Sequence, residues 1–262
     1  MRMRKWAAYL LCFLSLALLG ISGHFLADYA KQEEKADILQ EQLKEIYENQ
    51  KEETKEKPRQ DEEEQNLIHE GLLALHEKNK DCIGLLTIPD TLIDYPVMYH
   101  PEEVNYYLKR DFFREYSANG SLFLSENCSL KDCDNLIIYG HHMNSGKMFA
   151  ALEGYRERKF FKEHPFIFFN TLQGEEKYQV FAVFSTPVYT GSDFAYYTFT
   201  KAENRKSYET FIEAVKERSF YDTGITADYG EKLLTLSTCE YSQENGRLVV
   251  VAKKIAEKEI TK

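Results

Sequence analysis

The sequence contains no Cys-x-x-Cys pair, so it lacks the spacing that zinc ribbons and zinc fingers use. It has no Lys/Arg-dense stretch interleaved with aromatic residues, and its formal net charge is −10, which argues against nucleic-acid binding. It also has no internal repeat. Aromatic residues, by contrast, make up 14% of the chain and favour strands and binding grooves. The 262 residues are enough for one well-packed domain and additional segments.

One long stretch lacks charged residues altogether. Trp6–Ala27 spans 22 residues without Asp, Glu, Lys or Arg, and roughly 20 are needed to cross a bilayer as a helix. Basic residues precede this run and Asp28 follows it, so the positive-inside rule places the N-terminus in the cytoplasm and the remainder outside the cell. A cleaved signal peptide is the alternative, but its apolar region is normally only about 7–15 residues long. We therefore expect residues 1–27 to be a cytoplasmic stub and a transmembrane anchor in the cell membrane.

The next segment, residues 28–66, is strongly charged. It carries 13 acidic and 7 basic residues between Lys31 and Glu64. Leu39, Leu43 and Ile46 recur at helical spacing, so part of the segment is expected to be an exposed helix. The composition suits a tether between the membrane and a folded domain, which we expect to cover residues 67–262; binding of a partner through the apolar stripe is the alternative.

The folded domain is expected to be rich in strands. Ile68, Leu72 and Leu75 predict an amphipathic helix at its start, and further helices are expected at Met148–Tyr155 and Asn204–Arg218. Between them lie short apolar runs, bounded by turn residues, that predict at least eight strands. These runs are residues 83–88, 92–98, 121–125, 135–142, 166–170, 178–186, 232–239 and 247–253. The pattern indicates a mainly β fold, either a single closed barrel or a sandwich, with peripheral helices.

Three of these strands carry reactive side chains at one end. His141 follows Gly140 at the end of an apolar strand, Cys239 ends another, and Arg247 opens a third. A strand-end Cys near a cation is a candidate nucleophile, although a lone Cys is often only a small buried hydrophobe. Arg247 lies eight residues after Cys239 across a polar turn, which fits a hairpin that returns its guanidinium toward the Cys. A surface Arg is the alternative.

Two further pairs of residues leave alternatives open. His141 and His142 are adjacent, and neighbouring side chains on a strand point to opposite faces, so they are not expected to share a metal ion. One is expected to be functional and the other supporting, or both are solvent-exposed. Cys128 and Cys133 either form a local disulfide, if the domain is extracellular, or remain two unpaired thiols.

These motifs together resemble those of the sortase family. Thr235-Leu236-Ser237-Thr238-Cys239 is similar to the family's TLxTC signature, and Gly140-His141 to its Gly-His strand end. The run Arg247–Lys253 is similar to the strand that bears the family's Arg, and the order His, Cys, Arg agrees. The doubled His, the helix at Asn204–Arg218 and the N-terminal anchor resemble class B. The resemblance implies a closed eight-stranded β-barrel and covers roughly residues 65–255.

The resemblance also implies a reaction. Cys239 would be the nucleophile, His141 the acid and base, Arg247 the oxyanion stabiliser and His142 a supporting residue, without a metal or other cofactor. The substrates would be surface proteins with a C-terminal sorting motif, cleaved after Thr through a thioacyl-enzyme, and the acceptor an amine of a peptidoglycan precursor. By matching position, the candidate substrate-binding residues are Ser237, Thr238, Glu240, Tyr196, Tyr197 and Leu108.

The sequence departs from some class B members in two respects. Tyr241 occupies a position that is acidic in some of them, and the spacing from Cys239 to Arg247 is shorter. Both differences bear on substrate preference more than on chemistry. Three rival functions are a class B-like pilin polymerase that uses a Lys amine, a papain-like protease, and an inactive binding module. The papain order, with Cys before His, is reversed here.

Overall fold

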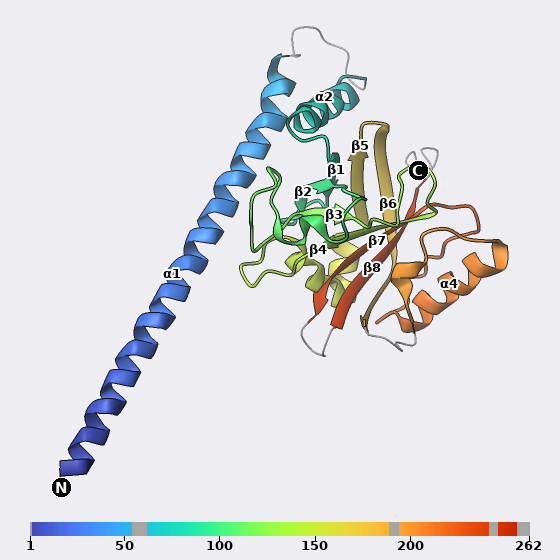
Figure 1. The fold of residues 1–262 in the computed structure, drawn as a ribbon. Coiled ribbons are helices and arrows are strands. Elements are labelled where there is room, and N and C mark those ends of the chain that lie inside the picture. Colours follow the sequence, from blue (N-terminus) through green and yellow to red (C-terminus); the bar gives the residue numbers. More distant parts are fainter. Residues whose placement is uncertain (1, 54–61, 189–193, 241–245, 256–262) are drawn as a thin grey trace. The chain divides into compact units, whose positions relative to one another are not determined.

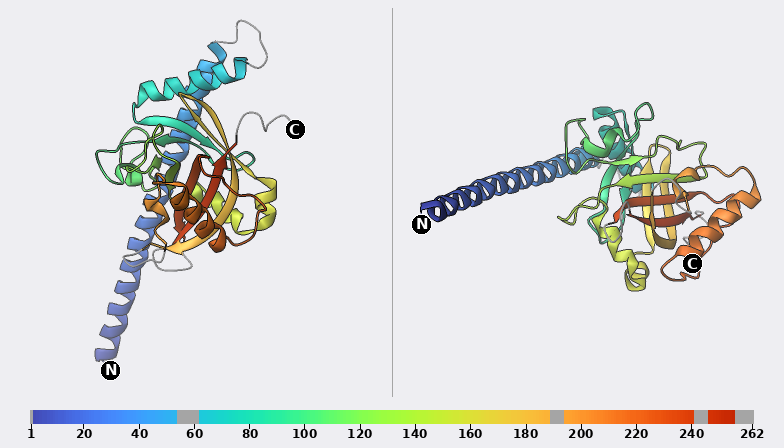
Figure 2. Two further views of the ribbon diagram at one scale, coloured as in Figure 1. Left: turned by 90° about the vertical axis from the view of Figure 1, so that its right-hand side faces the viewer. Right: turned by 60° about the horizontal axis from the view of Figure 1, so that its bottom comes forward.

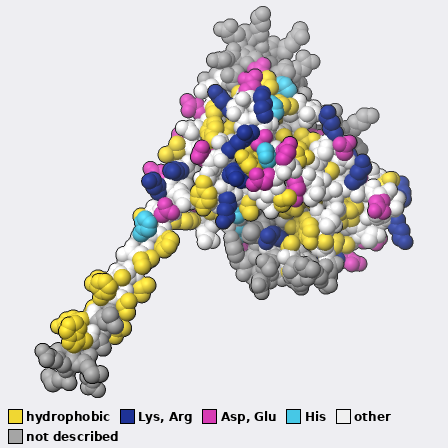
Figure 3. Space-filling model, viewed as in Figure 1, with side chains coloured by type: hydrophobic (Ala, Val, Ile, Leu, Met, Phe, Trp, Pro, Cys, Tyr) yellow, Lys and Arg dark blue, Asp and Glu magenta, His cyan; other side chains and the backbone are white. Residues whose placement is uncertain are grey.

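The computed structural model describes residues 2–53, 62–188, 194–240 and 246–255 (Figure 1). The chain forms two compact units, residues 1–44 and 45–262. Helix α1, Arg2–Glu53, is continuous; its residues up to Lys44 belong to the first unit and the remainder to the second. Its apolar N-terminal part has exposed hydrophobic side chains (Figure 3), and by length and composition α1 is able to cross a membrane.

The described part of the second unit folds as a closed barrel of eight strands in the order β1-β2-β3-β4-β7-β8-β6-β5 (Figures 1 and 2). Most neighbouring strands are antiparallel, but β2 pairs with β3, and β4 with β7, in parallel. The strands are β1 (Cys82–Thr87), β2 (Asp94–Met98), β3 (Leu122–Leu124), β4 (Asn135–Gly140), β5 (Phe166–Thr171), β6 (Gly174–Pro187), β7 (Leu233–Glu240) and β8 (Gly246–Lys254).

Helices and short helical turns surround this barrel. Helix α2, Glu62–Lys78, precedes β1, and short 3-10 helices lie in the described connections. The remaining elements are η1 (Tyr106–Lys109), η2 (Phe149–Arg156), α3 (Arg158–Glu163), η3 (Tyr196–Thr198) and α4 (Arg205–Arg218).

Two apolar clusters explain why residues 248–252 of β8 are all hydrophobic. Leu248 and Val250 belong to the cluster that fills the barrel, whereas Val249 and Val251 belong to a second cluster outside it. Alternate side chains of a strand point to opposite faces, so a strand buried on both faces must be apolar at every position. The second cluster also contains the apolar face of α4, including Tyr208 and Val215.

Helix α4 begins with a capping box. The Asn204 side chain accepts a hydrogen bond from the Ser207 backbone N–H at 3.0 Å, and the Ser207 hydroxyl lies 3.1 Å from the Asn204 N–H, which donates to it. This reciprocal pair satisfies two N–H groups that have no partner within the helix. It fixes the first turn of the helix that covers the outer cluster beside β6.

We expect Asn204→Ala to lower the free energy of unfolding by about 1 kcal/mol, the usual effect of losing an N-cap side chain. Chemical denaturation of the full chain in detergent micelles measures this change. Asn204→Asp is the matched control, because aspartate caps helices as well as asparagine does. Equal stability of the Ala variant and the wild type would contradict the role of the cap.

The expected closed barrel with peripheral helices is confirmed. Each expected strand is present with small shifts at its ends, but β6 begins at Gly174 instead of Tyr178. Its early residues Glu175–Lys177 are charged and pair with β5, so no apolar pattern announces them. The helix expected at Met148–Tyr155 is the 3-10 segment η2, Phe149–Arg156.

Candidate active site

The candidate active site lies at one edge of three neighbouring strands. Strand β7 lies between β4 and β8 in the barrel. Because β4 and β7 are parallel, both end at the same edge, and Gly140 pairs with Thr238 there. Antiparallel β8 starts at this edge, with Arg247 directly opposite Cys239. The backbone therefore brings Cys239 next to Arg247, and His141 follows Gly140 at the same edge.

His141 is held by contacts on both its backbone and its ring. Its carbonyl accepts a hydrogen bond from the Phe149 N–H at 2.8 Å. Its ring Nε2 lies 2.8 Å from the Leu108 carbonyl oxygen. A carbonyl can only accept, so Nε2 carries the proton in this contact. The His141 ring is thereby oriented by a residue 33 positions earlier in the chain.

The glycine before His141 is required by close packing. A Cβ at Gly140 would overlap the Leu122 side chain and lie 2.7 Å from Cδ2 of Phe149. Real Cβ atoms essentially never approach that closely. The Gly-His pair therefore lets β4 pack against Leu122 and Phe149 up to the residue before His141. His142 is half-buried and its backbone bridges to Met148, which closes the following turn.

Arg247 is half-buried at the second position of β8. It lies between Cys239 on β7 and Thr186 on β6 in the register of the sheet. One of its guanidinium nitrogens, Nη1, donates to the Gly246 carbonyl at 3.0 Å. A guanidinium has five donors in a fixed fork, so this bond leaves donor capacity for an anionic group.

Residues 194–200, which precede α4, form hydrogen bonds with β4 and β7. The hydroxyls of Tyr196 and Ser237 lie 2.6 Å apart, and both residues are buried. At the other end of the segment, the Thr200 carbonyl accepts hydrogen bonds from the backbone N–H groups of Asp134 and Asn135. Residues 194–200 therefore form a wall that is bonded to both β4 and β7.

The other candidate binding residues are distributed around this edge. Thr238 is buried, whereas Leu108 and Tyr197 are half-buried. The side chains of Cys239 and Glu240 lie outside the described part of the structure, as does Tyr241. Substrate contact by any of these residues stays a prediction. The Leu108 carbonyl, as the acceptor for His141, was not expected from the sequence, because a backbone acceptor leaves no signal in residue type.

Two of the buried cysteines, Cys82 and Cys128, are poor nucleophiles. Burial raises the pKa of the Cys82 thiol to about 12 and, likewise, that of Cys128 to about 12. Both are therefore protonated at neutral pH, and the thiol is much less nucleophilic than the thiolate. Cys133 is also buried, and the thiols of Cys128 and Cys133 are free in this structure.

Comparison with known proteins agrees with this geometry. The family model described as the sortase domain matches residues 86–255. Sortase B of Staphylococcus aureus is 34% identical over 183 residues, which cover 69% of this chain and 72% of that protein. Sortase B of Listeria monocytogenes is 34% identical over 189 residues, covering 71% and 74%.

A solved structure is similar over most of the chain as well. The Staphylococcus aureus sortase B–substrate complex superimposes with a TM-score of 0.71 at 28% sequence identity, covering 86% of this chain and 98% of that one. The residues matched by the family model include His141, Cys239 and Arg247. The chain therefore belongs to the sortase family of cysteine transpeptidases, with sortase B proteins among its relatives.

Proposed function

We propose that this protein is a membrane-anchored class B sortase. It cleaves a C-terminal sorting motif after Thr and joins the resulting protein to an amine of a peptidoglycan precursor. Cys239 is the nucleophile, His141 the acid and base, and Arg247 the oxyanion stabiliser. The observation that carries this proposal is the common edge of β4, β7 and β8, where these three positions are neighbours.

The first half of the reaction makes a thioester. The Cys239 thiolate attacks the carbonyl carbon of the substrate Thr, and the negative charge that develops on the carbonyl oxygen is stabilised by Arg247. His141, which holds the proton of the Cys239 thiol as an imidazolium, then gives that proton to the leaving nitrogen as the C–N bond breaks. The products of this half are a thioacyl-enzyme and the free C-terminal fragment.

The second half transfers the acyl group. An acceptor amine attacks the thioester carbonyl, His141 takes the proton from that amine, and the C–S bond breaks. Cys239 leaves as a thiolate, so enzyme and charge return to their starting states. Water in place of the amine would give slow hydrolysis.

Two features of the described residues support these roles. The raised pKa values of the buried Cys82 and Cys128 thiols disfavour them as nucleophiles, which favours Cys239. The wall of residues 194–200, bonded to β7 through Tyr196 and Ser237, provides a rigid side for a peptide beside Cys239. A solved relative in complex with substrate supports a sorting-signal peptide as the ligand.

The N-terminal helix supports a location at the membrane. Its apolar part has a mean hydropathy of 1.7 over the most apolar window, and none of that window is buried. With the basic residues before it, the domain of residues 67–262 would stand outside the cell, where cell-wall precursors and sorting signals meet.

The test uses the full chain in detergent micelles and a library of quenched sorting-signal peptides, with and without an amine acceptor. We expect cleavage after Thr, a thioacyl-enzyme detected by mass spectrometry, and a ligated product when amine is present. A product formed only with a Lys side chain of a pilin domain would move the assignment to a pilin polymerase. Cleavage of unrelated unfolded proteins would indicate a protease, and no cleavage of any peptide would refute the proposal.

A further inference from the structure

The ring of His141 depends on a carbonyl that belongs to a distant turn. Nε2 of His141 donates to Leu108 O, and Leu108 lies in η1, Tyr106–Lys109. A neutral imidazole has one N–H, and the partner of one ring nitrogen decides which nitrogen holds it. With the proton on Nε2, the nitrogen that gains and loses a proton during the reaction is Nδ1.

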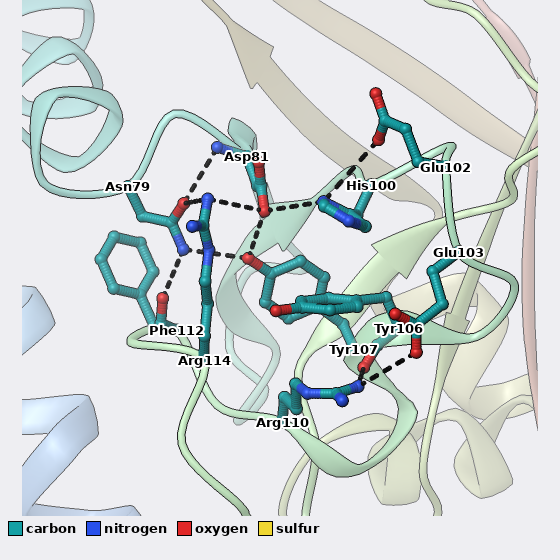
Figure 4. Close-up of polar contacts among 10 residues, drawn as sticks. All are labelled: Asn79, Asp81, His100, Glu102, Glu103, Tyr106, Tyr107, Arg110, Phe112 and Arg114. Carbon is teal, nitrogen blue, oxygen red and sulfur yellow. Dashed lines mark hydrogen bonds and ion pairs between the residues drawn. The ribbon is translucent and has the colours of Figure 1, made fainter.

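The η1 turn is held by a polar network in which Tyr107 and Asn79 are buried (Figure 4). Tyr107 is 1% exposed, and its hydroxyl donates to Asp81 Oδ2 at 2.7 Å. Burial and the hydrogen bond to Asp81 raise the pKa of Tyr107 to about 12, so the hydroxyl keeps its proton and remains a donor at neutral pH. Asn79 Nδ2 donates to the same hydroxyl at 3.0 Å.

The acceptor in this network is itself fixed by several donors. Arg114 donates to Asp81 Oδ2 at 3.1 Å, and His100 Nδ1 lies 3.2 Å from the same oxygen. The Asp81 backbone N–H donates to Asn79 Oδ1 at 3.0 Å. Figure 4 shows Tyr107, His100 and Arg114 converging on the Asp81 carboxylate, all three from the segment between β2 and β3 that contains η1. The residue directly before Leu108 is therefore anchored to the barrel.

The Leu108 carbonyl also packs against Gly120, where a larger residue would not fit. Gly120 has a φ of +58°, and a Cβ on it would overlap Leu108 O and lie 2.8 Å from Tyr107 O. The Ser121 N–H, one residue further on, donates to Tyr107 O at 3.1 Å. Gly120 and Ser121 therefore fix the positions of the Tyr107 and Leu108 carbonyls.

We propose that Gly120 and Tyr107 are positioning residues for His141: they hold the Leu108 carbonyl where it keeps the neutral imidazole protonated at Nε2. This inference rests on the proposed function, which assigns His141 as acid and base. Displacing the carbonyl would free the ring to rotate and to place its proton on Nδ1. Nδ1 would then be unable to take a proton during the reaction. Tyr107 and Gly120 need not touch substrate for this.

The test compares Gly120→Ala with Gly224→Ala in the full chain. Gly224 also has a positive φ, +75°, but no atom lies within 4 Å of an added Cβ. Both variants carry the backbone strain of alanine at positive φ, and only Gly120→Ala pushes the Leu108 carbonyl. We expect kcat to fall roughly 100-fold in Gly120→Ala, as for a misplacement of about 1 Å, with KM nearly unchanged and Gly224→Ala close to wild type.

A second readout separates positioning from folding. Nitrogen-15 NMR of the imidazole, assigned with His141→Ala, reports the tautomer of His141 at a pH where the ring is neutral. We expect the Nε2–H form in wild type and a mixture of tautomers in Gly120→Ala and in Tyr107→Phe. Tyr107→Phe keeps the ring and removes only the hydroxyl, so it decides the question if Gly120→Ala does not fold.

Two results would overturn this inference. One is that Gly120→Ala and Tyr107→Phe both keep the Nε2–H form of His141 and the wild-type kcat. The other is that Gly224→Ala loses as much activity as Gly120→Ala. If instead the proposed role of His141 as acid and base is wrong, His141→Ala would retain transpeptidation, while the wild type would still show the Nε2–H tautomer. This result differs from both of those that would overturn the positioning inference.

Discussion

Cys239→Ala is expected to abolish transpeptidation, with a fall in kcat of at least about 10⁴-fold. Removal of a catalytic nucleophile leaves only the contribution of binding and charge stabilisation, because no covalent intermediate can form. Mass spectrometry of the full chain incubated with a sorting-signal peptide would show the acyl adduct on the wild type and none on Cys239→Ala. Stopped assays with an amine acceptor would show no ligated product.

The matched control for this variant is Cys133→Ala. Cys133 is a buried, free cysteine in the connection between β3 and β4, away from the edge where Cys239 lies. It is expected to keep wild-type kcat with a modest loss of thermal stability. An acyl adduct that persists in Cys239→Ala, or one that disappears in Cys133→Ala, would show that Cys239 is not the nucleophile.

Arg247→Gln is expected to lower kcat by about 10²–10³-fold while KM changes little. Removing one donor to a developing oxyanion has effects of this size in other acyl-transfer enzymes, and the interaction is made only in the transition state. Glutamine keeps a hydrogen-bond donor but is shorter than arginine and has no charge. Steady-state kinetics with the best peptide from the library measure both parameters.

Arg205→Gln is the control for the loss of a positive charge. Arg205 is exposed at the start of α4 and pairs with Glu209 at 3.2 Å on the same helix. A surface pair of this kind contributes little, so this variant should match the wild type. A large rise in KM with unchanged kcat for Arg247→Gln would instead make Arg247 a substrate-binding residue.

Patterns within single strands were sufficient to anticipate much of the barrel. Leu248–Ala252 is apolar at every position because the interior cluster and the α4 cluster bury alternate side chains of β8. The early part of β6 could not be anticipated in this way. Glu175–Lys177 gain their strand conformation from pairing with β5, which a local apolar pattern does not report.

The active-site edge was anticipated only in part. The sequence indicated that His141, Cys239 and Arg247 lie at strand ends. The reason that these ends meet at one edge is the parallel pairing of β4 with β7, which depends on the order of all eight strands in the described barrel. Packing around the Leu108 carbonyl is harder still. Gly120 and Asp81 contribute to it from separate segments, and neither lies in a motif.

The pairing of β4 with β7 has a consequence for how the molecule folds. The Thr235 hydroxyl donates to the Asn135 side chain across a sequence separation of 100 residues. Contacts between such distant residues form slowly, because a long loop must close before any of them forms. Strand β4 therefore remains unpaired with β7 until the whole intervening chain and β7 itself have been synthesised. Cys239 and His141, the proposed nucleophile and base, come together only as the barrel closes, so we expect partly folded chains to be inactive.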